Sequence, residues 1–130
     1  MYDKWPDFGE TEVGFPEQRA LFDLLWALNG APPPVIDSDD LLENPEAVVE
    51  TFCAAVGIPF KPEALSWEPG GDPSAHSWWD GGSFHHNLAK STGLTPQTRK
   101  YVEVKDAPER VRRVHRRMKP HYDHLYAHRI

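Results

Sequence analysis

Two adjacent histidines in a loop rich in glycine and tryptophan are the residues of this sequence best suited to chemistry. His85 and His86 follow Asp80-Gly81-Gly82. An imidazole exchanges protons near neutral pH, so either histidine suits a general base, and Asp80 is a nearby carboxylate that would orient it. The pattern therefore predicts His85, His86 and Asp80 as catalytic residues. In the alternative, one imidazole bonds the loop backbone and the other is solvated.

Aromatic rings accompany these histidines along the chain. Trp78, Trp79 and Phe84 lie within a few residues of them, and Trp67 occurs earlier in the same stretch rich in proline and glycine. Apolar walls with few polar groups are typical of small-molecule sites. We expect residues 59–84 to form an irregular loop, and its tryptophans argue against disorder. Trp67, Trp78, Trp79 and Phe84 are accordingly predicted to bind a small-molecule substrate.

Other groups of polar side chains give weaker predictions of a functional site. His121, His124 and His128 share one flank of a C-terminal helix, but zinc would need further ligands from elsewhere, so we expect no metal site. Arginine suits phosphate or sulfate oxygens, yet the favoured interpretation of the basic side chains on this helix is pairing with acids of the N-terminal half. Cys53 is expected to be a small core residue. The basic side chains are Arg110, Arg112, Arg113, Arg116, Arg117 and Lys119.

The first expected element is an amphipathic helix. Leu21, Leu24, Leu25 and Leu28 recur with helical spacing, and Gly30 followed by three prolines ends the pattern. Phe22 and Trp26 form a second apolar edge, which makes the hydrophobic face unusually wide. Large exposed apolar patches signal association. We therefore expect a homodimer, or a complex with a partner chain, through the Phe22/Trp26 face.

Three further elements complete the expected organisation, after an extended lead-in over residues 1–12. Val35-Ile36-Asp37 has the composition of a short buried strand, which must pair either with a copy in another chain or with weak extended segments elsewhere. After a polar turn, Asn44-Pro45 begins a helix that Gly57 ends. A terminal helix over residues 108–127 should kink at Pro120.

Length and charge limit the classes of function. The 130 residues suit a single domain with a small core, and 39% of them are apolar. Residues 1–65 carry 13 acids and 3 bases, whereas residues 66–130 carry 7 acids and 11 bases. The acidic half disfavours nucleic acid, and a small anion would be favoured near the other half. With one cysteine and no long apolar stretch, we expect a cytoplasmic protein without a membrane span.

No glycine-rich phosphate-binding motif of the forms GxxxxGK[ST] or GxGxxG occurs in the sequence. A set of ordered segments nevertheless resembles the P-loop sulfotransferase-like family, some members of which are labelled branched-chain aminotransferase-like. The resemblance runs over nearly all of the chain, and its most specific part is the segment 35–45. The segments are Pro6–Phe8, Glu12–Phe15, Val35–Pro45, Gly57–Phe60, Ala64–Gly70, His85 with Ser91–Gly93, and Pro120–Tyr122 with Leu125–Ala127.

The resemblance implies an α/β fragment, mostly α-helical, that corresponds to the C-terminal half of the family's fold, with one short central strand and a long tryptophan-rich loop. In the family, an N-terminal phosphate loop and an arginine and serine segment bind the donor 3′-phosphoadenosine 5′-phosphosulfate. Neither motif has a matching position here. The segment 84–93 resembles a later active-site loop, which adds Lys90 and Ser91 as residues expected to contact an anion.

Three functions are then open. The first, which we favour at this point, is a small-molecule tailoring enzyme that performs acid–base chemistry, such as cyclisation or isomerisation, with no bound cofactor and no sulfuryl-donor site of its own. The second is a sulfotransferase subunit that acts with a separate donor-binding chain. The third is a non-catalytic binding or assembly module. A scaffold alone cannot choose among them, because function belongs to the site.

Overall fold

The computed structural model describes residues 9–70, 90–96 and 102–130 of the chain. The chain forms two compact units: unit 1 comprises residues 1–37 and 98–130, and unit 2 comprises residues 38–97. The described residues are mostly helical, as the sequence predicts. The α-helices are α1 (Phe15–Asn29), α2 (Ser38–Glu43), α3 (Pro45–Val56) and α5 (Glu109–Tyr126), and the 3-10 helices are η1 (Pro62–Leu65) and η3 (Val104–Asp106).

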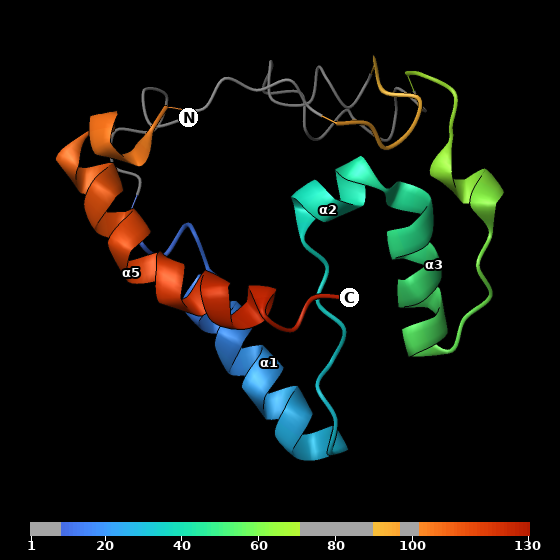
Figure 1. Cartoon of the computed structure of the whole chain (residues 1–130), viewed down its shortest axis with the longest axis horizontal. Coiled ribbons are helices and arrows are strands. Elements are labelled where there is room, and N and C mark those ends of the chain that lie inside the picture. Colours follow the sequence, from blue (N-terminus) through green and yellow to red (C-terminus); the bar gives the residue numbers. More distant parts are fainter. Residues whose placement is uncertain (1–8, 71–89, 97–101) are drawn as a thin grey trace. The chain divides into compact units, whose positions relative to one another are not determined.

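Unit 1 is built on the packing of α1 against α5, two helices far apart in the sequence (Figure 1). Glycines in the left-handed conformation bound α1 at both ends: Gly14 precedes it with φ 71°, and Gly30 follows it with φ 73°. The Gly30 amide donates to the Trp26 carbonyl at 2.9 Å, which satisfies one of the carbonyls left over at the helix end. The predicted helix and its predicted end are therefore confirmed.

Phe22 is the buried side chain of α1 where that helix contacts α5. It is only 4% exposed, and its ring centroid lies 5.7 Å from that of His124 and 5.1 Å from that of His128. The expectation that Phe22 lies on an exposed association face is therefore wrong, although Trp26 of the same edge is 37% exposed. Three leucines of the stripe are exposed instead, because α1 turns its other apolar edge towards α5, and Leu25 is half-buried. Exposed fractions are 56% for Leu21, 54% for Leu24 and 71% for Leu28.

The expected strand at residues 35–37 is reduced to one bridge. Val35 pairs in parallel with Arg129, and the Ile130 amide donates to the Val35 carbonyl at 3.0 Å. Pairing thus occurs with a weak extended segment of the same chain, one of the two predicted alternatives, and a central strand is absent from the described residues. Three preceding prolines lack the N–H groups that a ladder needs, and α2 begins at Ser38, so little backbone is left for a strand.

Helix α5, Glu109–Tyr126, corresponds to the terminal helix expected over residues 108–127. It continues through Pro120, which has no N–H to donate to the Arg116 carbonyl. Val114, Met118 and Leu125, at 5–8% exposed, hold one side of the helix in the unit 1 core on both sides of the proline. The kink at Pro120 remains a prediction.

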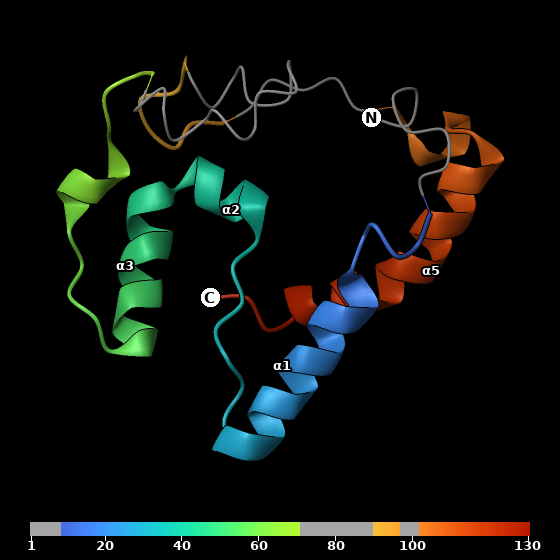
Figure 2. The same cartoon turned by 180° about the vertical axis from the view of Figure 1, so that it is seen from behind.

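Unit 2 contains α2 and α3, which pack together (Figure 2). Pro45 stands in the first turn of α3, and Gly57, with φ 74°, ends it as predicted. The Ile58 amide then donates to the Cys53 carbonyl at 3.0 Å. Cys53 is 7% exposed, which confirms its assignment to the core. The polar segment 38–43 is helical, where the sequence predicts only a turn.

Among the helices in the described part of the chain, none combines the length and the apolar character needed to cross a membrane.

The first turn of α5 depends on a carboxylate shared by two arginines. One Glu109 oxygen lies 2.7 Å from Arg112 Nη2, and the other lies 3.0 Å from Arg116 Nη2. Hydrogen bonds from Arg116 and then from Arg112 lower the pKa of the Glu109 carboxyl. Because folding lowers this pKa, the stabilisation is present above the carboxyl's unfolded-state pKa and is lost as pH falls through the folded-state value.

Replacing Phe22 by Ala should lower the free energy of unfolding of unit 1 by about 3 kcal/mol, since a large buried ring is removed. Leu28→Ala, on the exposed edge of the same helix, is the matched control and should change it by less than about 0.5 kcal/mol. Urea unfolding followed through amide signals of α1 and α5 measures both. Equal effects of the two substitutions would contradict the assignment of Phe22 to the core.

Acid should loosen the start of α5 through Glu109. Between about pH 6 and about pH 3, the amides of residues 112–114 should lose exchange protection in the native protein, whereas Glu109→Gln should show low protection throughout this range. Glu17→Gln, in the first turn of α1, is the control and should leave the acid response of α5 unchanged. The same acid response in the Glu109 variant and the native protein would show that the carboxylate is not responsible.

Candidate functional site

A contact that we call the clasp joins two segments of unit 2 and consists of Ser66, Trp67, Ser91, Thr92 and Gly93. Ser66 and Gly93 form an antiparallel bridge, and the Trp67 amide donates to the Thr92 carbonyl at 3.0 Å. The Trp67 indole Nε1–H also donates to Ser91 Oγ at 3.1 Å. The clasp therefore combines backbone and side-chain hydrogen bonds. Its side-chain bond joins two residues, Trp67 and Ser91, that are 24 positions apart in the sequence.

Gly93 is required for the two segments to approach this closely. A Cβ atom placed on Gly93 would stand 2.9 Å from the Leu65 carbonyl oxygen, which belongs to the backbone and cannot turn aside. On the other side of the clasp, Gly70 has φ 93°, in the left-handed region that glycine favours. Glycine thus serves two different purposes here: Gly93 allows the close approach of the two segments, and Gly70, beside the clasp, allows a turn.

The clasp brings together two of the residues that the sequence predicts for substrate binding, Trp67 and Ser91, and Lys90 immediately precedes Ser91. Trp67 is 39% exposed although its indole N–H is bonded, so part of the ring remains accessible. Lys90 is exposed and Ser91 is half-buried. The clasp thus presents the aromatic surface of Trp67, and Lys90 adds an ammonium group one residue before Ser91. This combination suits a small molecule with a negative charge.

The other predicted site residues fall between the two sides of the clasp in the sequence. Asp80, His85 and His86, predicted to be catalytic, and Trp78, Trp79 and Phe84, predicted to bind substrate, lie outside the described residues. Their roles remain predictions. Because Trp67 and Ser91 are bonded, however, the segment that carries these six residues is anchored at both ends in one place.

His124 of α5 and His128, which follows the end of that helix, face α1. The rings of His124 and His128 lie 5.3 Å apart, and His128 also lies 5.2 Å from Trp26. His124 Nε2 is 3.4 Å from Asp23 Oδ1, without hydrogen-bond geometry. No group of three or more metal-ligating side chains occurs within the described ranges. The periodicity placed these histidines on one flank but did not reveal that α1 covers it.

The basic side chains of α5 pair mostly within their own helix. Besides the two that share Glu109, Lys119 Nζ lies 2.6 Å from Asp123 Oδ1. Arg117 pairs with Glu10 at 2.9 Å and fits the predicted attraction to the acidic N-terminal half. All of these pairs are largely exposed, where an ion pair contributes about 1 kcal/mol at most.

Comparison with known proteins adds a family. A sulfotransferase domain family matches residues 2–114 of the chain. Branched-chain-amino-acid aminotransferase-like protein 2 of Arabidopsis thaliana is 35% identical over 94 residues, which are 67% of this chain and 16% of that protein. For branched-chain-amino-acid aminotransferase-like protein 1 of Arabidopsis thaliana the identity is 31% over 86 residues, 65% of this chain and 15% of that protein. The chain thus spans a small part of each relative's length. No solved structure matches the chain.

Trp67→Phe removes the indole donor and keeps an aromatic ring, so it isolates the Trp67–Ser91 hydrogen bond. Loss of one such bond should speed exchange of the residue 67 amide roughly fivefold, the effect of about 1 kcal/mol. Ser91→Ala removes the same bond from the other side and should have the same effect. The double variant should then exchange no faster than either single variant, because both remove one interaction.

Additive effects of the two substitutions would contradict the clasp as described. Gly93→Ala provides a second readout, since its methyl group collides with the Leu65 carbonyl and should speed exchange more than either polar substitution. Amide exchange by NMR measures all four variants.

Proposed function

The chain belongs to the sulfotransferase domain family, and on that premise we propose that it carries the acceptor side of an enzyme that transfers a sulfuryl group to a small molecule. The observation that carries the proposal is the clasp, which anchors both ends of the segment holding Asp80, His85 and His86. Anchoring a loop reduces the number of positions its side chains reach, and positioning is a large part of catalysis.

In the proposed reaction, an acceptor hydroxyl oxygen forms a bond to the sulfur of the donor while the bond from sulfur to the donor's phosphate oxygen breaks. The hydroxyl proton goes to a base, and we assign that role to His85 or His86, with Asp80 orienting the imidazole. The developing negative charge on the departing phosphate requires a cation nearby, and Lys90, exposed next to the clasp, is the side chain we assign to it.

Substrate contact is assigned to the clasp itself and to the rings beside it in the sequence. The accessible part of the Trp67 ring would stack on an acceptor, and its bonded indole N–H fixes the orientation of that ring. Trp78, Trp79 and Phe84 are proposed as the remaining apolar walls. Ser91 Oγ accepts the indole hydrogen bond, so Ser91 would act mainly as a positioning residue for Trp67.

The donor's nucleotide is assigned to residues outside the described ranges, in this polypeptide or in a second chain. Among the described helices, a glycine-rich turn of the kind that holds a pyrophosphate is not found; Gly14 alone precedes α1. The same observation favours a second candidate function, acid–base chemistry at the same residues without a sulfuryl donor. Association with a partner chain likewise stays a prediction.

Sulfuryl transfer to a library of phenols, alcohols and amines, followed by mass spectrometry, tests the proposal on the full-length protein. We expect donor-dependent products, and replacing the histidine that acts as base by Gln should reduce kcat by about 10²-fold or more. The matched control is replacement of the neighbouring histidine, which should change kcat far less. His115→Gln, on α5, is a second control and should leave kcat unchanged.

The outcomes separate the candidates. Donor-dependent products whose rate is insensitive to both His85→Gln and His86→Gln would contradict the assignment of the base. Rearranged substrate formed without donor, and lost in one histidine variant, would support the second candidate function. Absence of product, together with absence of thermal stabilisation by 3′-phosphoadenosine 5′-phosphate, would overturn sulfuryl transfer by this polypeptide without a second, donor-binding chain.

A further inference from the structure

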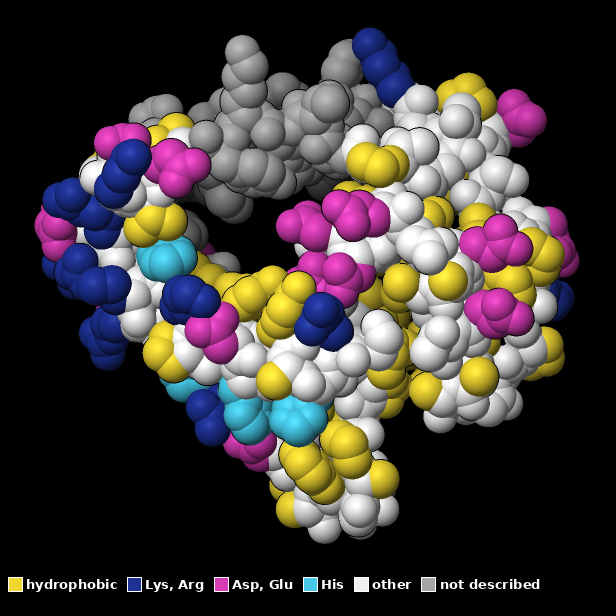
Figure 3. Space-filling model, in the orientation of Figure 1, with side chains coloured by type: hydrophobic (Ala, Val, Ile, Leu, Met, Phe, Trp, Pro, Cys, Tyr) yellow, Lys and Arg dark blue, Asp and Glu magenta, His cyan; other side chains and the backbone are white. Residues whose placement is uncertain are grey.

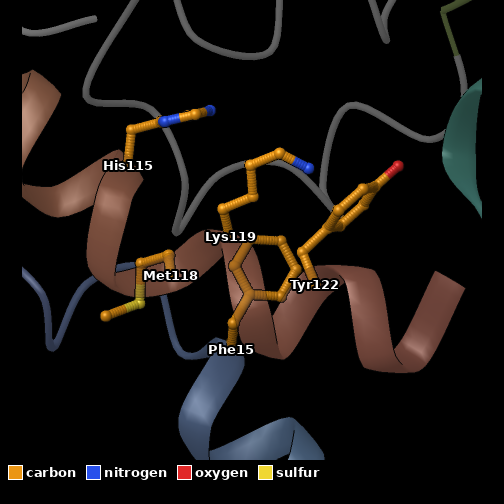
Figure 4. A pocket seen from close by; sticks show the side chains of 5 residues that line it. All are labelled: Phe15, His115, Met118, Lys119 and Tyr122. Atoms are coloured by element: carbon orange, nitrogen blue, oxygen red, sulfur yellow. The ribbon is translucent and has the colours of Figure 1, made fainter.

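A pocket of about 310 Å³ lies in unit 1, where the first turn of α1 meets α5. Phe15 comes from α1, and His115, Met118, Lys119 and Tyr122 come from α5. Figure 4 shows His115, Lys119 and Tyr122 projecting from one side of α5, with the Phe15 ring rising from α1 towards them. The volume is at the lower end of the range of roughly 300–1,000 Å³ typical of ligand sites, so the pocket suits a molecule of one or two rings.

The aromatic walls of this pocket are held in place by contacts outside it. The Tyr122 hydroxyl donates to Asp37 Oδ2 at 2.9 Å, and its ring stacks on Tyr126 at 5.4 Å. Phe15 meets the same Tyr122 ring edge-on, with centroids 5.5 Å apart and planes inclined at 72°. A ligand ring would therefore meet walls that are already ordered, and little side-chain entropy would be lost on binding.

One cationic side chain, Lys119, lines the pocket. Lys119 Nζ makes two hydrogen bonds to the Asp123 carboxylate, at 2.6 and 2.8 Å, which leaves its third N–H without a partner among the described residues. His115 makes no hydrogen bond or ion pair with the described part of the chain. Over its whole length α5 carries six Arg and Lys side chains and two acids, and Figure 3 shows Lys and Arg gathered along it.

We propose that this pocket binds a small aromatic anion. The ring would lie against Phe15, Met118 and Tyr122, and the anionic group would accept hydrogen bonds from Lys119 Nζ and from His115. Apolar contact alone would bind any flat ring, but the Lys119 ammonium in the lining selects an anion over a cation of the same shape. None of these five residues takes part in the proposed transfer reaction, so the site is an additional one.

Three probes that share a naphthalene ring test the charge selection on the full chain: 2-naphthoate, 2-naphthalenemethanol and 2-naphthylmethylammonium. Amide and side-chain NMR titrations should show 2-naphthoate shifting the signals of the five lining residues. The alcohol should bind about fivefold more weakly, the ratio expected when one exposed ion pair of about 1 kcal/mol is lost. The ammonium compound should bind more weakly still.

Lys119→Met removes the charge and keeps a long apolar side chain, so it should reduce naphthoate affinity to that of the alcohol. Arg116→Met, on the same helix but outside the pocket, is the matched control and should change naphthoate affinity less than about twofold. Native amide signals of α5 verify that both variants fold. Equal binding of all three probes, unchanged selectivity in Lys119→Met, shifts at other residues, or no binding of naphthoate would each overturn the proposal.

Discussion

The hydrogen-bonded contact between Ser66–Trp67 and Ser91–Gly93 is the constraint on which the proposed chemistry depends. The Trp67 amide donates to the Thr92 carbonyl, and the Trp67 indole N–H donates to Ser91, 24 positions away. A side chain at position 93 would collide with the backbone, because a Cβ atom there would lie 2.9 Å from the Leu65 carbonyl oxygen. Without this contact, the segment bearing Asp80, His85 and His86 would be tethered only by chain connectivity. The entropy of a long unanchored loop opposes any fixed catalytic geometry.

Unit 1 depends in a comparable way on few contacts. Phe22 is the one buried side chain of α1, and its ring lies against the imidazole rings of His124 and His128. Phe15, at the start of the same helix, packs edge-on against Tyr122 of α5, and these two rings line the pocket. The contact between α1 and α5 and the proposed ligand pocket therefore both depend on aromatic packing.

Local sequence patterns predicted the helices better than they predicted contacts. Periodic apolar residues and the glycines at 30 and 57 located α1 and α3 and their ends, since those signals act within a few residues. The same periodicity did not reveal which apolar edge of α1 is covered, because that depends on where α5 packs. The acidic residues of segment 38–43 suggested a turn, although it forms α2. The β-branched pair at 35–36 suggested a strand, but prolines before it left a single bridge.

The candidate site shows the same difference between local patterns, which the sequence reveals, and long-range contacts, which it does not. Residue types in a glycine-rich and tryptophan-rich stretch predicted a reactive segment, and the family resemblance added Lys90 and Ser91. The bond between Trp67 and Ser91 could not be predicted, since no local signal links positions so far apart. The family itself is confirmed, since the sulfotransferase domain family matches residues 2–114.

The most direct measurement of the central claim is the sulfuryl-transfer rate of the full-length enzyme carrying Gly93→Ala, whose added methyl group collides with the Leu65 carbonyl oxygen and opens the clasp. If the clasp positions the reactive segment, kcat should fall by up to about a hundredfold, the cost of slight misplacement, while the amide signals of α1 and α5 stay native. A kcat equal to that of the native enzyme, with the clasp demonstrably opened, would contradict the account.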